Sequence, residues 1–236
     1  ESIKESYSIL PVLVFEKSEE KKKNIIEKKI SEDFSFLPLL LINDIGKGFS
    51  SCLNYGIQKT NSKYIFRLDT DDRTFAKRLL DQIKIMDEEN IDICSGYMKD
   101  QNGKVLSYPA NLKSISLMTA MGTNPIPHPT VCIRRNSLFL TYDETLSKCE
   151  DFDLWLRFFL SKSLKINVLK NPITVYDTSR SFQKDKDNAL VQIKLRLKYI
   201  RKISITLLVL ILGLFPNILR LIFIKNTFLF IRRKLK

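Results

Sequence analysis

Cysteine is scarce in this chain of 236 residues, and its spacing excludes two common kinds of site. The four cysteines form no CxxC pair and show no metal-finger spacing, which argues against a zinc site and against a disulfide framework. We therefore expect free thiols, two in strands and one in a helix, in a reduced, cytoplasmic compartment. The four are Cys52, Cys94, Cys132 and Cys149.

Acidic residues are absent after Asp187, and this absence locates the formal charge of +13. The last 48 residues carry eleven Lys and Arg, so residues 1–188 hold a net charge of only +2. The basic part is also the most apolar part of the chain. This combination favours a membrane surface as the partner and argues against nucleic acid.

An uninterrupted apolar run long enough for a transmembrane helix is also missing. Residues 203–215 form an apolar run of 13 residues, and Pro216, Asn217 and Arg220 interrupt its extension to residue 224. A spanning helix needs about 20 mostly apolar residues. We therefore favour two helices lying in the cytoplasmic leaflet over a membrane span. The alternative is that residues 203–224 cover an apolar face of the preceding domain.

The chain lacks a signal peptide and an initiator Met, and its first residues are typical of a helix end. We expect from this that the start of the domain is missing. The apolar content of 44% argues against disorder and is enough to build a core. We predict an N-terminally incomplete globular domain over residues 1–188. A basic, apolar, membrane-associating helical tail is predicted over residues 189–236.

Short apolar runs alternate with helical patterns along the chain. We predict strands over the runs, and helices where apolar residues recur every three or four positions. The predicted strands are 10–15, 37–42, 63–68, 91–97 and 131–134, and the predicted helices are 18–30, 49–57, 75–86 and 151–161. A hairpin turn is expected at 100–103. This order predicts an α/β domain with a mainly parallel sheet and helices on both faces.

The strand predicted over 63–68 is followed by three carboxylates, Asp69, Asp71 and Asp72. In open α/β sheets, ligands bind outside the carboxyl ends of the strands. Carboxylate oxygens at that edge suit Mg²⁺ or Mn²⁺, bound together with the phosphates of a substrate. The alternative is an acidic turn that caps the next helix, because Asp is favoured at helix N-termini.

Two further motifs carry candidate residues. An acidic pair at 150–151 opens an aromatic-rich helix, whose dipole would help to keep Asp151 ionised for removal of a hydroxyl proton. The alternative is that these are first-turn charges only. His128, the only histidine, stands among prolines that fix the backbone, although a lone histidine is more often structural. Trp155 lies at helical spacing with other aromatic residues, and we expect it in the core.

Taken in order, these motifs resemble glycosyltransferase family 2, the inverting glycosyltransferases with the GT-A fold. The resemblance is closest to bacterial members that build exopolysaccharide, capsule or lipopolysaccharide chains, and it covers residues 1–180. It implies a GT-A fold for the domain. The segments that carry it are Gly46-Lys47-Gly48, Leu53-Asn54-Tyr55-Gly56-Ile57, Asp69-Thr70-Asp71-Asp72, Asn124–Thr130 and Glu150–Arg157.

The resemblance implies roles for three carboxylates. Asp69 would lie at the ribose and the metal, Asp71 would bind the metal, and Asp151 would be the general base. The implied cofactor is Mg²⁺ or Mn²⁺, which would offset the negative charge that accumulates on the leaving diphosphate.

Other residues are implied at the donor site. His128 and Arg157 would contact the donor phosphates or hold the acceptor loop. Lys47 would face a phosphate at the glycine-containing turn, unless it is only a surface lysine, and Asn54 belongs to the motif that follows. Family members end their second strand in an acidic pair that contacts the base. This chain has Glu16 in that place, so Glu16 is expected to substitute for the contact.

The implied function is transfer of a sugar, with inversion, from a nucleoside diphosphate sugar to a saccharide or lipid-linked acceptor in surface polysaccharide synthesis. UDP is the default donor nucleotide. The expected partners are the nucleotide sugar, the acceptor and a membrane surface, with no nucleic acid. The expected place is the cytoplasmic face of the bacterial inner membrane, with peripheral or shallow insertion.

Two alternatives to this function remain open. Phosphatases of the haloacid dehalogenase type also carry Asp-x-Asp after a strand, but they need Thr or Val where this chain has Arg73. The other alternative is a GT-A-like domain that binds sugar or partner proteins at the membrane without catalysis.

Overall fold

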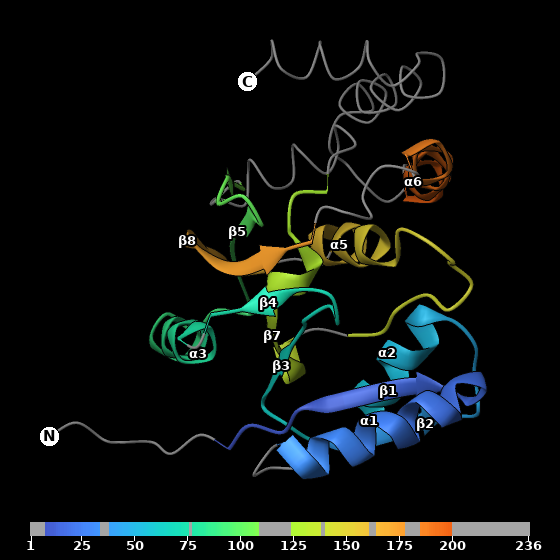
Figure 1. Cartoon of the computed structure of the whole chain (residues 1–236). Helices are drawn as coiled ribbons and strands as arrows, with labels where there is room; N and C mark the ends of the chain where they lie inside the picture. The colour runs from blue at the N-terminus through green and yellow to red at the C-terminus, as the bar shows by residue number, and fades with distance from the viewer. Residues whose placement is uncertain are drawn as a thin grey trace, which may run out of the picture. The chain divides into compact units, whose positions relative to one another are not determined.

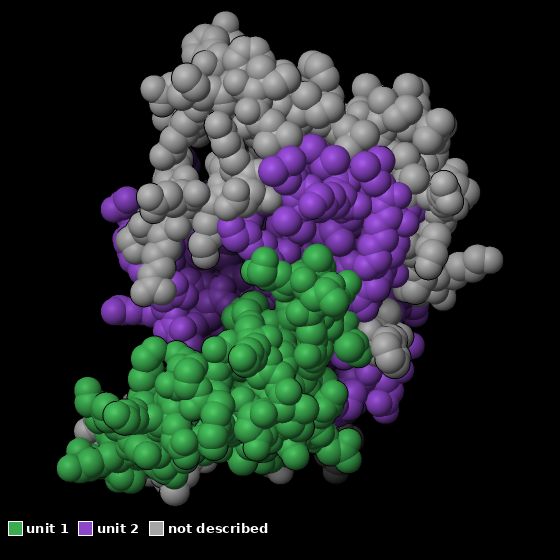
Figure 2. Space-filling model, turned by 90° about the vertical axis from the view of Figure 1, so that its right-hand side faces the viewer, with its two compact units in different colours: residues 1–61, 141–147 green, residues 62–140, 148–236 purple. Residues whose placement is uncertain are grey.

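The computed structural model describes residues 8–33, 38–75, 77–108, 124–137, 140–160, 164–177 and 185–199 (Figure 1). The chain divides into two compact units, which Figure 2 shows in different colours. The first unit comprises residues 1–61 and 141–147, and the second comprises residues 62–140 and 148–236. The apolar tail expected at 203–224 lies outside the described residues. Within the described ranges, no helix has the length and apolar character needed to cross a membrane.

The first unit is built on two parallel strands, β1 (Val12–Glu16) and β2 (Leu39–Asn43). Helix α1 (Glu20–Asp33) connects them, and α2 (Phe49–Gln58) follows β2. Both helices lie alongside the strand pair, as Figure 1 shows in blue. These elements confirm the predicted strand–helix–strand–helix order, and the parallel pair is the direction that the alternation predicts.

The turn before α2 requires glycine. Gly48 has a φ of +85°, a left-handed conformation that side chains with a Cβ rarely adopt. Its N–H donates to the Glu16 carboxylate at the end of β1, with a distance of 2.7 Å between N and Oε1. At Gly46, a Cβ would lie 1.9 Å from the Ser51 hydroxyl oxygen, so the backbone approaches α2 closely there. The glycine motif therefore shapes the loop that follows β2.

The second unit contains a six-stranded sheet with the order β3-β7-β5-β8-β4, and β6 pairs with β5. Strands β5 and β8 run parallel, whereas the other four pairings are antiparallel. The strands are β3 (Tyr64–Phe66), β4 (Arg73–Thr74), β5 (Ile93–Asp100), β6 (Val105–Leu106), β7 (Cys132–Arg134) and β8 (Ile166–Tyr176).

The prediction of a mainly parallel sheet is therefore wrong for this unit. Strand β7 lies antiparallel between β3 and β5, because the chain enters it from the proline-rich segment and not from a crossover helix. The hairpin expected at 100–103 is confirmed, since β5 and β6 are antiparallel neighbours and Asp100 accepts from the Gly103 N–H at 3.0 Å.

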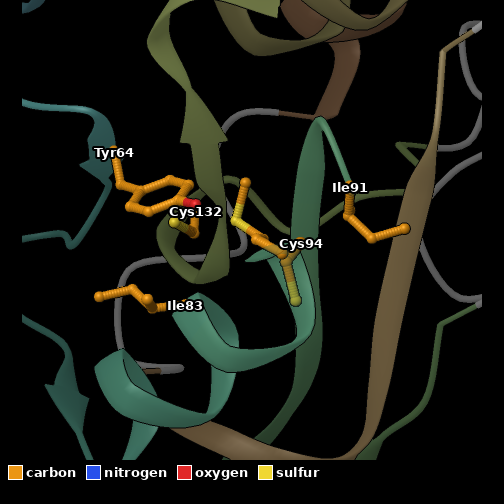
Figure 3. Packing of buried hydrophobic residues seen from close by; sticks show 6 residues of the cluster. Tyr64, Ile83, Ile91, Cys94 and Cys132 are labelled. Atoms are coloured by element: carbon orange, nitrogen blue, oxygen red, sulfur yellow. The ribbon is translucent and has the colours of Figure 1, made fainter. Parts of the chain in front are cut away.

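Helix α3 (Arg78–Glu88) covers part of this sheet. Its residues Ile83 and Met86 pack against side chains of β3, β5 and β7 in the core shown in Figure 3. The helix predicted from Phe75 begins three residues later, because the Phe75 N–H donates to the Ile173 carbonyl beside β4. Cys94 and Cys132 are fully buried in this core, and all four cysteines are free thiols, as predicted.

Strands β5 and β8 meet closely at Gly96. A Cβ on Gly96 would lie 2.6 Å from the Ile173 Cδ1 atom, so only glycine leaves room for that side chain. The pairing register shifts on both sides of Tyr97, next to this contact. Neighbouring β5 residues such as Ile93 and Cys94 have no exposed surface, so the strand is buried on both faces.

Helices α5 (Glu150–Leu160) and α6 (Asp185–Tyr199) also belong to this unit. Trp155 and Phe158 of α5 are buried and pack at 5.8 Å between ring centroids, which confirms the prediction of a core tryptophan. Helix α6 runs across the boundary expected at 188–189. Its Leu195 and Tyr199 are buried in the same unit, so the folded domain extends to the end of this helix.

Candidate active site

The carboxylate turn, residues 69–72, begins three residues after the end of β3 in the second unit. It is fixed by its own backbone, since the Asp72 N–H donates to the Asp69 carbonyl at 3.1 Å. The strand end before it is fixed as well, because the Arg67 N–H donates to the Val131 carbonyl at 3.0 Å. The acidic residues thus stand at the carboxyl end of a strand, as the sequence predicts.

The three carboxylates of the turn differ in exposure. Asp69 is half-buried and forms an ion pair with the Arg67 guanidinium. Burial raises the pKa of Asp69, the Arg67 charge lowers it, and the neighbouring Asp71 raises it. Asp71 is exposed at the tip of the turn. The turn therefore presents one carboxylate to solvent and holds a second beside a cation.

Asp72 is the carboxylate that sequence reasoning left without a role. Its Oδ1 accepts from the Asp177 N–H at 3.2 Å, which ties the turn to the end of β8. Its Oδ2 is buried and has no hydrogen-bond partner among the described residues. Burial, opposed by the Asp177 N–H and reinforced by Asp69 and Asp71, raises the pKa of Asp72 to about 6. The presence of three aspartates within four residues is the signal that could have identified Asp72.

The turn has the chemistry of a divalent-cation site. Within the described ranges, no three His, Cys, Asp or Glu side chains gather closely enough to form a complete metal cage. Mg²⁺ does not require one, because it binds through one or two carboxylates and completes its shell with water and substrate phosphates. Asp69 and Asp71 supply that number of carboxylates, and the buried, unpartnered Asp72 oxygen adds negative charge behind them. These residues fit Mg²⁺ or Mn²⁺.

Asp151 opens α5 and is held by two donors. Its Oδ1 accepts from the Phe152 N–H at 2.7 Å, and its Oδ2 accepts from the Asn124 side-chain amide. Burial raises the pKa of Asp151, while the Phe152 and Asn124 donors lower it. The expected ionising effect of the helix terminus is thus outweighed by burial. A partly buried, hydrogen-bonded carboxylate with a raised pKa is suited to proton abstraction.

The carboxylate turn and Asp151 belong to the same unit and act on each other. The charge of Asp69 raises the pKa of Asp151, and it also raises the pKa of the neighbouring Glu150, whose burial is the larger cause. Asn124 and Glu150 were not among the residues selected as functional from the sequence. Asn124 stands at the first position of the proline motif, and its contact with Asp151 joins two motifs that the sequence keeps apart.

His128 is buried in a short 3-10 turn and stands edge-on to Trp155, with 6.3 Å between ring centroids. Burial and the Arg67 charge lower the pKa of His128 well below its ordinary value, which favours the neutral ring. A neutral, buried imidazole gives little attraction to a phosphate. These contacts favour the interpretation that His128 is part of the core and not a phosphate ligand.

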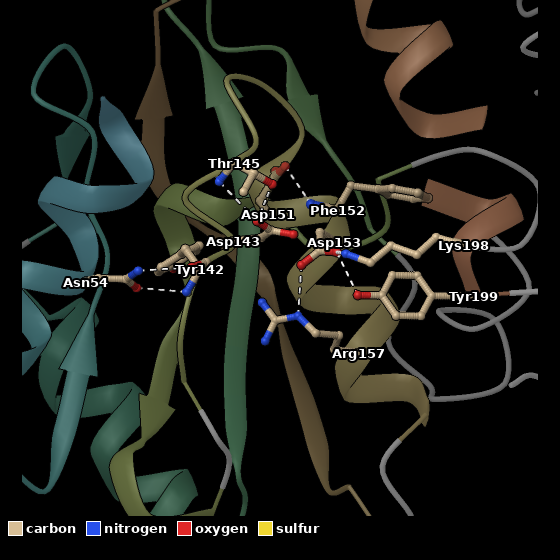
Figure 4. A network of polar contacts seen from close by, with 10 residues as sticks. All are labelled: Asn54, Tyr142, Asp143, Thr145, Asp151, Phe152, Asp153, Arg157, Lys198 and Tyr199. Carbon is tan, nitrogen blue, oxygen red and sulfur yellow. Dashed lines mark hydrogen bonds and ion pairs between the residues drawn. The ribbon is translucent and has the colours of Figure 1, made fainter. Parts of the chain in front are cut away.

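Arg157 lies one helical turn after Asp153. Its Nε donates to the Asp153 Oδ2 at 2.8 Å, and Figure 4 shows this pair beside Tyr199 and Lys198 of α6. Asp153 is fully buried and also accepts from the Tyr199 hydroxyl at 2.9 Å. Arg157 therefore neutralises a buried carboxylate between two helices.

The first unit holds the other predicted donor-site residues. Lys47 is exposed in the loop between β2 and α2, and Glu16 holds the Gly48 N–H at the start of that helix. Asn54 is buried in α2. Its Nδ2 donates to the Tyr142 carbonyl, and its Oδ1 accepts from the Tyr142 N–H, as Figure 4 shows. Its Nδ2 also donates to the Glu144 carboxylate at 2.8 Å. Through these hydrogen bonds, Asn54 holds the 141–147 segment against α2.

Comparison with known sequences gives a consistent family. The family model described as "Glycosyl transferase family 2" matches residues 12–146. An uncharacterised glycosyltransferase of Methanocaldococcus jannaschii is 27% identical over 191 residues, covering 78% of this chain and 63% of the relative. The amylovoran biosynthesis glycosyltransferase AmsE of Erwinia amylovora is 28% identical over 131 residues, covering 52% of this chain and 48% of the relative. The chain thus spans less than two thirds of the length of these relatives.

Solved structures resemble the fold over most of the chain. S. aureus TarS in complex with UDP-GlcNAc superimposes with a TM-score of 0.59 at 17% identity, covering 89% of this chain and 62% of that one. A mannosyltransferase from Pyrobaculum calidifontis in complex with GDP-Man and Mn²⁺ gives a TM-score of 0.62 at 13% identity, covering 89% of this chain and 62% of that one. At these identities the likeness concerns the fold, and it confirms the predicted GT-A architecture.

Proposed function

Since this chain belongs to glycosyltransferase family 2, we propose that it transfers a sugar from a nucleoside diphosphate sugar to a hydroxyl of a saccharide or lipid-linked acceptor, with inversion at the anomeric carbon. The observation that carries the proposal is that one unit holds both the carboxylate turn after β3 and Asp151, which the Asn124 amide and the Phe152 N–H hold at the start of α5. One carboxylate belongs to the turn suited to a cation and a diphosphate, and the other is suited to be a base. These are the two groups that glycosyl transfer requires.

The donor is a nucleoside diphosphate sugar in this proposal, with UDP as the first nucleotide to test. Support comes from structural neighbours, of which one binds UDP-GlcNAc and another binds GDP-Man with Mn²⁺. Asp69 and Asp71 would hold the cation. A bound Mg²⁺ or Mn²⁺ would offset the charge of the leaving diphosphate as a Lewis acid.

Asp151 acts as the general base. Its carboxylate takes the proton of the acceptor hydroxyl while the hydroxyl oxygen attacks the anomeric carbon from the face opposite the diphosphate. Asn124 and the Phe152 N–H fix the orientation of this carboxylate through their hydrogen bonds to its two oxygens. These two hydrogen bonds hold the carboxylate in one orientation, and a fixed orientation favours proton transfer to it.

The tail and one relative support our proposals for the acceptor and for the place of the reaction. The Erwinia amylovora relative is described as an amylovoran biosynthesis glycosyltransferase, which supports a polysaccharide acceptor. The basic, apolar sequence after residue 200 supports attachment to the cytoplasmic face of the bacterial inner membrane, where lipid-linked acceptors would be reached.

A donor panel tests the proposal. The full-length protein is incubated with UDP- and GDP-sugars and Mn²⁺, and nucleotide release is measured with and without EDTA. We expect release from one nucleotide class, lost with EDTA. Binding without release from any donor, with or without saccharide acceptors, would favour a non-catalytic sugar-binding domain. The absence of both binding and release would contradict the proposal.

A further inference from the structure

Arg78 is a buried charged residue with no part in the chemistry described so far. It is the first residue of α3, and only 2% of its surface is exposed. Burying a guanidinium in a protein core is costly unless its N–H groups find acceptors. Burial lowers the pKa of Arg78 to about 10, so the group remains charged at neutral pH.

The N–H groups of Arg78 reach three chain segments. Nη2 donates to the Arg67 carbonyl at 2.8 Å and lies 3.4 Å from the Val131 carbonyl. Nη1 lies 3.5 Å from the hydroxyl oxygens of both Thr74 and Thr174. All four acceptors are neutral oxygens, so this guanidinium positions backbone and hydroxyl groups and does not compensate a carboxylate in these contacts.

These segments are the ones that surround the carboxylate turn. Arg67 is two residues before Asp69, and Thr74 is two residues after Asp72. Thr174 stands on β8, three residues before Asp177, whose N–H holds the Asp72 carboxylate. The guanidinium therefore forms hydrogen bonds to the chain before and after the carboxylate turn. It also bonds β8, the strand whose end holds Asp72.

Gln82 orients this guanidinium. Its Oε1 accepts from the Arg78 Nε at 2.9 Å, and its Nε2 donates to the carbonyls of Cys94 and Thr130 at 2.8 and 2.9 Å. Thr130 closes the proline motif that begins at Asn124, the partner of Asp151. Arg78 and Gln82, one turn apart on α3, thus form hydrogen bonds to backbone near the carboxylate turn and to the proline motif that holds Asp151.

We propose that Arg78 is a positioning residue for the cation-binding turn: through the Arg67 carbonyl and the Thr74 and Thr174 hydroxyls it fixes Asp69 and Asp71 in the arrangement that binds a nucleoside diphosphate with its divalent cation. This inference rests on the proposed function. Arg78 does not touch the donor, and its effect passes through the backbone of the turn. Lysine at this position keeps the charge but lacks the planar fork that reaches several acceptors at once.

Calorimetric binding of UDP in the presence of Mn²⁺, with GDP in parallel, tests the inference on the full-length protein. We expect Arg78→Lys to weaken the binding of the preferred nucleotide by about 10–100-fold, the range for residues that orient metal ligands. The matched control is Arg134→Lys. Arg134 is in the same unit and donates to backbone carbonyls of Met86 and Ile91, at the other end of α3. Its replacement should leave nucleotide affinity unchanged.

A double-mutant cycle separates positioning from a general loss of stability. If Arg78 acts through the turn, adding Arg78→Lys to Asp71→Asn weakens nucleotide binding no further than Asp71→Asn alone. Multiplying losses in the double variant, or equal losses in the Arg78→Lys and Arg134→Lys variants, would overturn the inference. If the Arg78→Lys variant does not fold, Gln82→Met replaces it, and unchanged affinity in that variant overturns the inference equally. Failure of the unsubstituted protein to bind either nucleotide would instead refute the proposed function.

Discussion

His128 is the only titratable imidazole of the chain, and it is buried against Trp155. Because burial lowers its pKa below the ordinary value of 6.5, the unfolded chain takes up this proton at a higher pH than the folded chain does. The contribution of the neutral His128 imidazole to the free energy of unfolding is therefore complete above about pH 6.5. It is lost as the pH falls toward the folded-state pKa, by about 1.4 kcal/mol for each pKa unit of the shift.

Proton NMR measures this directly, because an untagged protein has a single pair of imidazole C–H signals. We expect no titration of these signals between about pH 7.5 and 5.5, the range over which an ordinary histidine would titrate. A matched His128→Gln variant should lose less stability than the unsubstituted protein over the same acidification. A midpoint near the ordinary value would show that the imidazole is exposed and would reopen a role in phosphate binding.

Single residues also mark the limit of what the sequence reveals about the site. The motifs and the family resemblance single out Asp69, Asp71 and Asp151, and the structure places them after β3 and at the start of α5. Asn54 and Arg157 also lie in segments that carry the resemblance, but in the structure Asn54 bonds the backbone of Tyr142 and Arg157 pairs with the buried Asp153 carboxylate. Their partners are 88 residues away for Asn54 and one helical turn away for Arg157, and residue type alone does not reveal either.

At the scale of elements, α6 is anchored to α5 by a buried polar contact. The Tyr199 hydroxyl donates to the Asp153 carboxylate, which is also paired with Arg157 (Figure 4). We expect Tyr199→Phe to destabilise the domain by about 1.5–3 kcal/mol, the usual contribution of a hydrogen bond to a charged group. Urea unfolding measures this as a lower midpoint with an unchanged slope.

Leu197 provides the control on the same helix, because its side chain is 52% exposed. Leu197→Ala should change the free energy of unfolding by no more than about 0.5 kcal/mol, as exposed positions usually do. An equal effect of Tyr199→Phe and Leu197→Ala would show that α6 is only loosely attached to α5.

The sequence predicts the elements of this fold better than their arrangement. Strands such as β1 and β2 and helices such as α5 lie within a few residues of their predicted bounds, because apolar spacing is a local property. The antiparallel direction of β7 depends on which strands it joins, and no local pattern encodes that choice. Helix α3 begins later than predicted for a related reason. The Phe75 N–H donates to the carbonyl of Ile173 on β8, 98 positions along the chain.

For the whole molecule, the tail predicts how the protein meets a membrane. The eight positive charges after residue 199, around an interrupted apolar run, should bind anionic vesicles through both electrostatics and apolar burial. We expect flotation with phosphatidylglycerol-containing vesicles to persist in about 0.5 M salt, because salt screens charges and leaves apolar burial intact. A variant ending after Tyr199, which retains α6, is the control and should not float.

Two other outcomes would count against the tether. Clean release of the full-length protein from vesicles by salt would leave only an electrostatic contact. Tight RNA binding that falls steeply with salt and requires residues after 199 would assign the charge to nucleic acid.

The central claim is that Asp71 binds the cation and Asp151 is the general base. Calorimetry combined with a transfer assay tests it most directly. Asp151→Asn should abolish sugar transfer and leave Mn²⁺-dependent nucleotide binding nearly intact, because the base acts on the acceptor. Asp71→Asn should weaken nucleotide binding itself, because it removes a carboxylate from the cation. Equal loss of nucleotide binding in both variants, or full transfer activity in Asp151→Asn, would contradict the account.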